Sequence, residues 1–162
     1  MSKLKFLRLA ASSIALTLGA SAHAQSAAAV APPAYDPVLA AKLGGNDNGM
    51  RQYVLVILKT GPNRVPTGPE RDEMFKGHFA NMKRLADAGK LAIAGPFDGD
   101  DGWRGMFIFA VPTVEEAKTL VATDPVVIKG EMVPEFHPLY ASAALMLVPD
   151  GHLRLSKPAP AQ

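Results

Sequence analysis

Two stretches of the chain are apolar at consecutive positions, a pattern typical of strands that are buried on both faces. Residues 53–58 read YVLVIL and residues 106–111 read MFIFAV. Side chains alternate between the two faces of a sheet, so a strand that is apolar at odd and even positions needs cover on both sides. A shorter apolar stretch at 91–94 ends at Gly95 and Pro96, where we expect the glycine to let the backbone turn tightly.

Helical periodicity separates these strands. Between residues 69 and 88 the apolar positions recur at helical spacing, and Gly89 follows as a stop signal. Thr113 and Glu116 have the spacing of a capping box, which predicts a second helix that ends before Pro125. The apolar positions of the first helix are Met74, Phe75, Phe79, Met82, Leu85 and Ala86.

Residues 129–140 carry the pattern of a last strand at the edge of a sheet. Pro134 and Pro138 fall within this stretch. Proline has no N–H group for the hydrogen-bond ladder, so it is confined to edge strands. The alternation places one set of residues on each face. The first face carries Met132, Pro134, Phe136 and Pro138, and the second carries Glu131, Val133, Glu135 and His137.

These elements follow in the order β-α-β-β-α-β, which is the ferredoxin-like arrangement of an α+β fold. It consists of a four-stranded antiparallel sheet with the helices on one face and the first and third strands in the centre. The sequence agrees, because the two strands that are apolar on both faces are the first and the third. The second face would be apolar and uncovered, which usually marks an interface. We therefore expect a homodimer through this open sheet face, a dimeric α/β barrel, with a cleft near the strand ends.

The start of the chain has the features of a secretory signal peptide at residues 1–24. Lys3, Lys5 and Arg8 precede an apolar stretch, and residues 22–24 (AHA) fit a cleavage site. The alternative is a membrane anchor, but the apolar stretch is shorter than the roughly 20 residues that a bilayer requires. We expect cleavage after residue 24, with the mature protein in the periplasm or secreted and not attached to a membrane.

The mature chain is expected to have three parts. Residues 25–49 form an Ala/Pro-rich linker with a short helix, capped by Asp36. Residues 50–148 form the folded domain, which ends in a short further strand at 145–148. Residues 149–162 form a C-terminal tail that opens with a Pro-Asp-Gly turn.

Composition excludes several classes of function. The chain has no cysteine, which excludes disulfides, thiolate metal sites and a cysteine nucleophile. It has 17 basic and 15 acidic residues, and three of the basic ones lie in the expected signal peptide, so the mature chain is nearly neutral. This balance gives no reason to expect nucleic acid as a partner. The sequence also lacks the motifs of serine hydrolases, P-loop proteins and dinucleotide-binding folds.

Five segments have an order and spacing that resemble one known family. They read MRQYVLVILKTGPN at 50–63, KGHFANMKRLADAGKLAIAGPF at 76–97, RGMFIF at 104–109, TVEEAKTLVATDP at 113–125 and EFHPLYASAAL at 135–145. Together they resemble the YciI-like (YCII-related domain) family of the dimeric α/β-barrel group, over about residues 35–147. The resemblance implies a ferredoxin-like fold, dimers, and a His-Asp pair as a proposed active site. Most members of the family have no assigned reaction, and one relative is a dechlorinating enzyme that acts on a chlorinated hydroxyhydroquinone.

The resemblance places the His-Asp pair at His78 and Asp124. An imidazole can give or take a proton near neutral pH, and a carboxylate bonded to one ring nitrogen fixes the tautomer of the ring. His78 falls on the sheet-facing stripe of its helix, and Asp124 lies where the second helix meets the last strand. The alternative is a structural histidine and an aspartate that caps a turn before proline.

Four further residues are candidates for binding a substrate: Gly95, Trp103, Arg104 and His137. An aromatic face and a guanidinium suit an aromatic or carboxylate ligand, although Trp103 and Arg104 are equally compatible with ordinary surface positions. His137 would line the dimer cleft or serve a structural role.

We expect no metal site and no cofactor. The mature chain has three histidines without a repeated spacing. The aspartates at 98, 100 and 101 lack the alternating ligands and the final glutamate of a calcium loop, so they indicate a solvated turn.

Two hypotheses for the function remain. The first is an exported, cofactor-free enzyme in which His78 and Asp124 perform acid/base chemistry on a small cyclic or aromatic compound, as a lyase, isomerase or dehalogenase. The alternative is a non-catalytic dimeric module that binds a small organic molecule or acts in a stress response.

Overall fold

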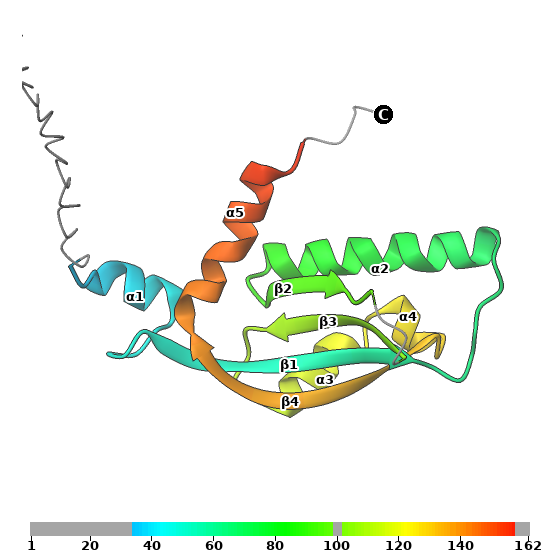
Figure 1. The fold of residues 1–162 in the computed structure, drawn as a ribbon, viewed down its shortest axis with the longest axis horizontal. Helices are drawn as coiled ribbons and strands as arrows, with labels where there is room; N and C mark the ends of the chain where they lie inside the picture. The colour runs from blue at the N-terminus through cyan, green and yellow to red at the C-terminus, as the bar shows by residue number, and fades with distance from the viewer. Residues whose placement is uncertain (1–33, 99–101, 158–162) are drawn as a thin grey trace, which may run out of the picture. The chain divides into compact units, whose positions relative to one another are not determined.

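A computed structural model of the protein describes residues 34–98 and 102–157. The expected signal peptide, the first part of the expected linker (residues 25–33), and two of the three aspartates of the turn at 98–101 lie outside these residues. Figure 1 shows a curved sheet with α2 running along one side of it. Within the described ranges, no helix has the length and apolar character needed to cross a bilayer.

The helices and strands follow one another in the expected order, with additions after α3 and after the last strand. They are α1 (Pro37–Leu43), β1 (Met50–Thr60), α2 (Pro69–Asp87), β2 (Leu91–Pro96), β3 (Trp103–Phe109), α3 (Val114–Val121), α4 (Pro125–Ile128), β4 (Met132–Ser142), a 3₁₀ helix η1 (Ala143–Leu147) and α5 (Val148–Leu155).

The expected helix caps are present. The Asp36 side chain accepts hydrogen bonds from two backbone N–H groups in the first turn of α1. Thr113 accepts the N–H of Glu116 at 3.2 Å, which caps α3. Such caps satisfy N–H groups that have no partner inside the helix. The starts of α1 and α3 are therefore fixed by local residues.

The sheet has the strand order β2-β3-β1-β4, and each neighbouring pair is antiparallel. The two strands that are apolar on both faces, β1 and β3, are the central ones, as the sequence predicts. The strand with two prolines, β4, lies at an edge, where missing N–H donors do not interrupt a second ladder. The ferredoxin-like α+β fold is confirmed.

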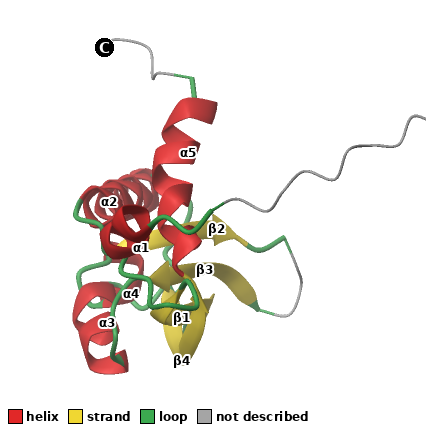
Figure 2. Cartoon of the chain, turned by 90° about the vertical axis from the view of Figure 1, so that its left-hand side faces the viewer, coloured by secondary structure: helices red, strands yellow, loops and turns green. Residues whose placement is uncertain are grey.

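One face of the sheet carries the main core. Helices α2, α3 and α4 lie together on this side (Figure 2). Buried residues of the central strands meet buried residues of the helices here, and burying each large apolar side chain contributes about 1.5–3 kcal/mol. The central-strand members of this cluster are Val54, Val56, Leu58, Phe107, Phe109 and, just after β3, Val111.

The other face has a smaller apolar cluster. Tyr53 and Ile108 are buried in it, while Leu55, Met106 and Leu139 are only half-buried. Leu145 and Met146 of η1 pack against the same cluster and cover part of it. The rest of this face has no helix of the described chain over it.

Two local predictions are wrong, and one short helix was not predicted. The short strand expected at 145–148 is the 3₁₀ helix η1 followed by the start of α5. The turn expected at the beginning of the C-terminal tail is the first turn of α5, because proline suits the first turn of a helix as well as a turn. Residues 125–128 form the short helix α4, with Pro125 at its first position.

Glu131, which immediately precedes β4, is completely buried. Its carboxylate accepts hydrogen bonds from the Val65 N–H at 2.7 Å and from Arg71 at 2.8 Å, and Arg104 and Arg64 lie at 3.5 and 3.7 Å. Burial alone would raise the pKa of Glu131. The hydrogen bonds from Val65 and Arg71, together with the charges of Arg71 and Arg64, outweigh burial and hold the pKa below its ordinary value.

A close approach of two backbone segments fixes the position of Glu131. The N–H of Gly61 donates to the carbonyl oxygen of Glu131 at 2.8 Å. A Cβ atom at position 61 would collide with the carbonyl oxygen of Gly130. Glycine at position 61 therefore allows the end of β1 to lie against the start of β4.

We expect Glu131→Gln to lower the free energy of unfolding at pH 7 by on the order of 3 kcal/mol, measured by urea denaturation, because it removes the charge that pairs with the partly buried Arg71 and Arg104. The pKa of Glu131 is lower in the folded state, so its stabilisation is present above the unfolded pKa of about 4.3 and is lost as the pH falls through the folded pKa. The two proteins should therefore converge in stability at acid pH.

The control is Glu73→Gln, which removes an exposed carboxylate paired with Lys76. Exposed pairs of this kind contribute about 0–1 kcal/mol. Equal stability of wild type and Glu131→Gln at pH 7 would contradict the role assigned to the buried carboxylate.

Candidate active site

His78 lies within α2, on the side of the helix that faces the sheet, and is 8% exposed. Three aromatic rings surround its imidazole. The ring centroids of Phe75 and Phe107 are each 6.0 Å away, and that of Phe79 is 5.4 Å away. An imidazole in such apolar surroundings depends on a small number of polar partners.

The polar partner of His78 is Asp124, which is 1% exposed and lies at the N-terminal end of α4. The Nδ1 atom of His78 is 2.9 and 2.8 Å from the two carboxylate oxygens of Asp124. One of these oxygens also accepts the N–H of Val126 at 3.1 Å, which caps α4. Asp124 thus combines the two roles that the sequence left open, since it caps a turn before proline and binds the histidine.

Gly77 permits the contact between the two helices. A Cβ atom on Gly77 would lie 3.0 Å from Cγ of Pro125, closer than side chains normally pack. The absence of a side chain lets α2 approach the start of α4. The residues on either side of this contact, His78 and Asp124, are thereby brought within hydrogen-bond distance.

The contact with Asp124 determines which nitrogen of His78 is available. A carboxylate accepts hydrogen bonds, so Nδ1 must carry a proton and donate it. His78 Nε2 makes no hydrogen bond within residues 34–98 and 102–157. In the described chain, Asn81 Nδ2 is the only side-chain nitrogen or oxygen that is both fully buried and without a hydrogen-bond partner. His78 Nε2 is therefore not fully buried and keeps some contact with solvent.

His78 lines a cavity of about 360 Å³ between α2 and the ends of β2 and β3. Such a volume lies within the range of small-molecule sites. The lining is mainly aromatic and aliphatic, with His78 and Arg104 as its charged or titratable groups. The aromatic and aliphatic side chains are Leu58, Phe75, Phe79, Met82, Pro96, Phe97, Met106, Phe107 and Met132.

Arg104 reaches this cavity because of an irregularity in β3. Leu58 pairs with Gly105 and the next residue, Lys59, pairs with Trp103, so Arg104 is an extra residue in the ladder. A bulge of this kind redirects side chains and is common beside active sites. Arg104 lies 3.5 Å from Glu131 and lines the cavity, while Trp103 packs against Phe97 with ring centroids 5.4 Å apart.

The two other candidate residues have different placements. Gly95 lines the cavity, but the tight turn expected there is absent, because β2 continues through it to Pro96. A Cβ atom at position 95 would have no neighbour within 4 Å. His137 is far from His78 in the fold, since it pairs with Leu55 on the opposite face of the sheet.

His137 instead belongs to a half-exposed polar group on that face. Its Nε2 is 2.8 Å from one oxygen of Glu135, and Lys59 Nζ is 2.9 Å from the other. The hydrogen bond from Lys59, followed by that from His137, lowers the pKa of Glu135.

The alternation used for the last strand is wrong at one position. It grouped Glu131 with His137, but β4 begins at Met132 and Glu131 turns toward Arg71 and Arg104. A glutamate next to an apolar strand carries no sign of burial by itself. The glycine at position 130, with φ of +70°, is the one local signal that the strand pattern stops there.

The described residues contain no cluster of three or more His, Asp or Glu side chains that could hold a metal ion. The chemistry that the arrangement can perform is proton transfer. A neutral Nε2 facing a cavity can accept a proton, and the Asp124 carboxylate stabilises the resulting imidazolium.

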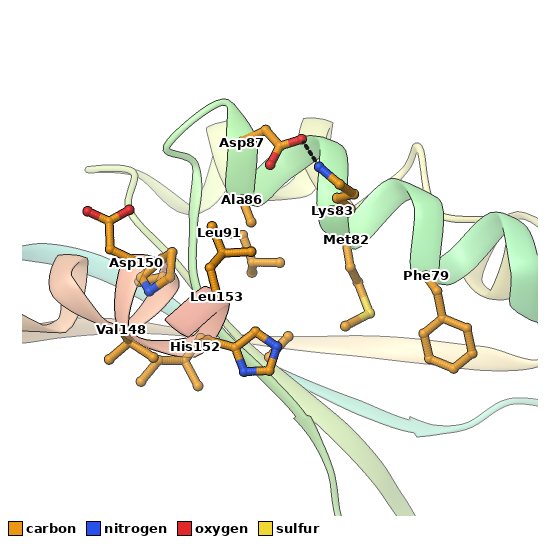
Figure 3. A pocket seen from close by; sticks show the side chains of 14 residues that line it. Phe79, Met82, Lys83, Ala86, Asp87, Leu91, Val148, Asp150, His152 and Leu153 are labelled. Carbon is orange, nitrogen blue, oxygen red and sulfur yellow. Dashed lines mark hydrogen bonds and ion pairs between the residues drawn. The ribbon is translucent and has the colours of Figure 1, made fainter. Parts of the chain in front are cut away.

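A second, larger groove of about 530 Å³ lies between α2, β2 and α5. Figure 3 shows Phe79 and Met82 of α2 on one side of it and Val148 and His152 of α5 on the other. It shares Phe79 and Met82 with the His78 cavity but contains neither His78 nor Asp124. We therefore place the candidate active site in the smaller cavity.

Comparison with known proteins identifies the family. No curated protein matches the chain. Among solved structures, the chain is similar to 5-chloro-2-hydroxyhydroquinone dehydrochlorinase from Burkholderia phenoliruptrix, in complex with 2,5-dihydroxybenzoquinone. The identity is 19% and the TM-score 0.39, and the match covers 55% of this chain and 90% of that one. The family described as YCII-related domain matches residues 52–134. Because this match spans more than half of the sequence, the chain belongs to the YCII-related domain family.

Proposed function

We propose that the protein is an enzyme in which His78 acts as a general acid and base on a small cyclic or aromatic compound. The observation that carries this proposal is the hydrogen bond between Nδ1 of His78 and Asp124 at a residue that lines the cavity, while Nε2 makes no hydrogen bond within the described residues. A purely structural histidine would need no cavity beside it.

The reaction can be described by the path of one proton. Nε2 takes a proton from a substrate hydroxyl or from an acidic carbon, and the electron pair of the broken bond stays on the substrate. The Asp124 carboxylate stabilises the imidazolium. The proton then returns to another atom of the substrate, which is an isomerisation, or to a leaving group, which is an elimination. Lyase, isomerase and dehalogenase chemistry all fit this path.

The cavity supports a substrate with one ring. Its volume is near the lower end for small-molecule sites, and aromatic side chains form much of its wall. Phe75, Phe97 and Phe107 offer faces and edges against which a ring packs. A small cyclic or aromatic compound therefore fits better than an extended chain.

His78→Gln should lower turnover by about 10²–10⁴-fold, since a positioned acid or base contributes that much. Asp124→Asn keeps an oxygen that can cap α4 but loses the charge, so kcat should fall while KM changes little. The assay is conversion, followed by mass spectrometry, of a panel of hydroxylated and halogenated cyclic compounds. The control is His152→Gln, at an exposed position on α5.

Unchanged turnover in His78→Gln would remove the histidine from the mechanism. If the compounds bind to the wild type but none is converted, the result favours the alternative of a non-catalytic module that binds a small ligand.

We also propose that two copies pair through the half-covered sheet face. Leu55, Met106 and Leu139 are half-buried there and lack a covering helix within the described chain. His137 would lie in this interface, because it pairs with Leu55.

Light scattering should give the mass of a dimer for the wild type and of a monomer for Leu55→Glu, because a buried charge without a partner opposes association. Ile128→Glu is the matched control, at an exposed position of α4 on the helical side of the sheet. A wild-type monomer, or a dimer that survives Leu55→Glu, would contradict pairing through this face.

Export is part of the same proposal and rests on the sequence of residues 1–24. N-terminal sequencing of the protein recovered from the periplasm or the medium should begin at Gln25. Recovery of the full-length chain only from the cytoplasm would contradict export.

A further inference from the structure

We infer that Arg104, braced by Glu131, forms a subsite for an anionic oxygen in the His78 cavity, so that the preferred ligands are ring compounds carrying a carboxylate, phenolate or enolate. This inference rests on the proposed function for the location of the site. It adds a prediction of the charge of the substrate, which the contact between His78 and Asp124 does not determine.

The first observation is an imbalance of charge. Three guanidinium groups, from Arg64, Arg71 and Arg104, lie within 3.7 Å of Glu131. Within the described residues, Glu131 is the only carboxylate at ion-pair distance from any of the three. Among these residues one negative charge therefore faces three positive ones, and an excess of positive charge favours the binding of an anion.

The second observation is that the hydrogen bonds of Glu131 to its partners differ in length. Its Oε2 accepts the Val65 N–H at 2.7 Å, and its Oε1 accepts Arg71 at 2.8 Å. Arg71 is further occupied, because the same nitrogen donates to the carbonyl of Val65 and the guanidinium lies over the ring of Phe75. Arg104 reaches Oε1 only at 3.5 Å, which is a long contact.

Glu131 therefore occupies Arg104 only weakly, and most of the N–H donors of Arg104 are left for another partner. A guanidinium has five N–H donors in a planar fork. One contact to Glu131 is the only side-chain hydrogen bond that Arg104 makes within residues 34–98 and 102–157. The bulge in β3 directs this side chain to the cavity, where it is partly exposed. The remaining donors have no partner in the described part of the chain and can bind both oxygens of a carboxylate.

The surroundings favour an anion attached to a ring. Arg104 and His78 line the same cavity, together with Phe75, Phe97 and Phe107. Charge-assisted hydrogen bonds are stronger where aromatic walls exclude water. A ring between the aromatic side chains would place its ionised oxygen at Arg104 and leave another position of the ring for Nε2 of His78.

The test measures binding rather than turnover. Trp103 is the only tryptophan of the chain and packs against Phe97, which lines the cavity, so we expect its fluorescence to change when a ligand enters. The probes are 4-hydroxybenzoate and its neutral analogue 4-hydroxybenzamide, titrated into the mature protein. We expect the wild type to bind the anion about tenfold more tightly than the amide, or better.

Arg104→Gln should abolish this preference, because it should weaken binding of 4-hydroxybenzoate about tenfold and leave binding of 4-hydroxybenzamide unchanged. Arg104→Lys keeps the charge but not the fork, and should retain part of the preference. Arg154→Gln, at an exposed position of α5, is the matched control and should bind like the wild type. Circular dichroism and thermal unfolding of each variant show that the fold is retained.

The inference is overturned if the wild type does not prefer the anion, if it shows no saturable binding of 4-hydroxybenzoate, or if Arg104→Gln keeps the preference. His78→Gln should retain the anion preference. Loss of turnover in His78→Gln with unchanged anion binding in Arg104→Gln would reject this subsite alone. An Arg104-dependent preference with unchanged turnover in His78→Gln would reject the proposed function alone.

Discussion

The contact between His78 Nδ1 and the carboxylate of Asp124 links the fold to the chemistry proposed for it. Both side chains are buried, so neither can exchange its partner for water without cost. Asp124 also caps α4, and Gly77 lets α2 approach close enough for the contact. One carboxylate thus caps the N-terminus of α4 and also binds the imidazole of His78.

Two buried carboxylates, Asp124 and Glu131, give the cavity its electrostatic character. Each lies behind a cavity side chain instead of facing the cavity itself, with Asp124 behind His78 and Glu131 behind Arg104. Their partners differ in kind. Asp124 holds a group that can gain or lose a proton, whereas Glu131 holds a permanent cation that is only partly neutralised. The arrangement provides a proton carrier and an anchoring charge in one apolar cavity.

The sequence predicted the frame of this site because local rules control it. Runs of consecutive apolar residues identified the central strands β1 and β3, two prolines identified β4 as an edge, and the caps at Asp36 and Thr113 are in place. The resemblance pointed to His78 and Asp124, but their contact depends on the close approach of α2 and α4, which the periodicity of either helix does not report. The same local rules failed at the end of the chain, where proline is compatible with both a turn and the first turn of α5.

Two further features concern which face a side chain occupies. One extra residue in β3, which the sequence did not predict, sets the direction of Arg104, and the late start of β4 makes the predicted placement of Glu131 wrong. Both depend on backbone pairing across the sheet and leave almost no trace in the sequence. His137 followed the alternation, and for that reason it lies on the opposite face from His78.

The most direct test of the central claim is the tautomer of His78, observed by nitrogen-15 NMR of histidine-labelled protein and assigned by comparison with His78→Gln. At a pH where the imidazole is neutral, the account predicts a protonated Nδ1 and an unprotonated Nε2, opposite to the form that free histidine prefers, and it predicts that the Nε2 signal shifts when a ligand enters the cavity. A proton on Nε2 in the neutral ring, or a signal that no ligand moves, would contradict it.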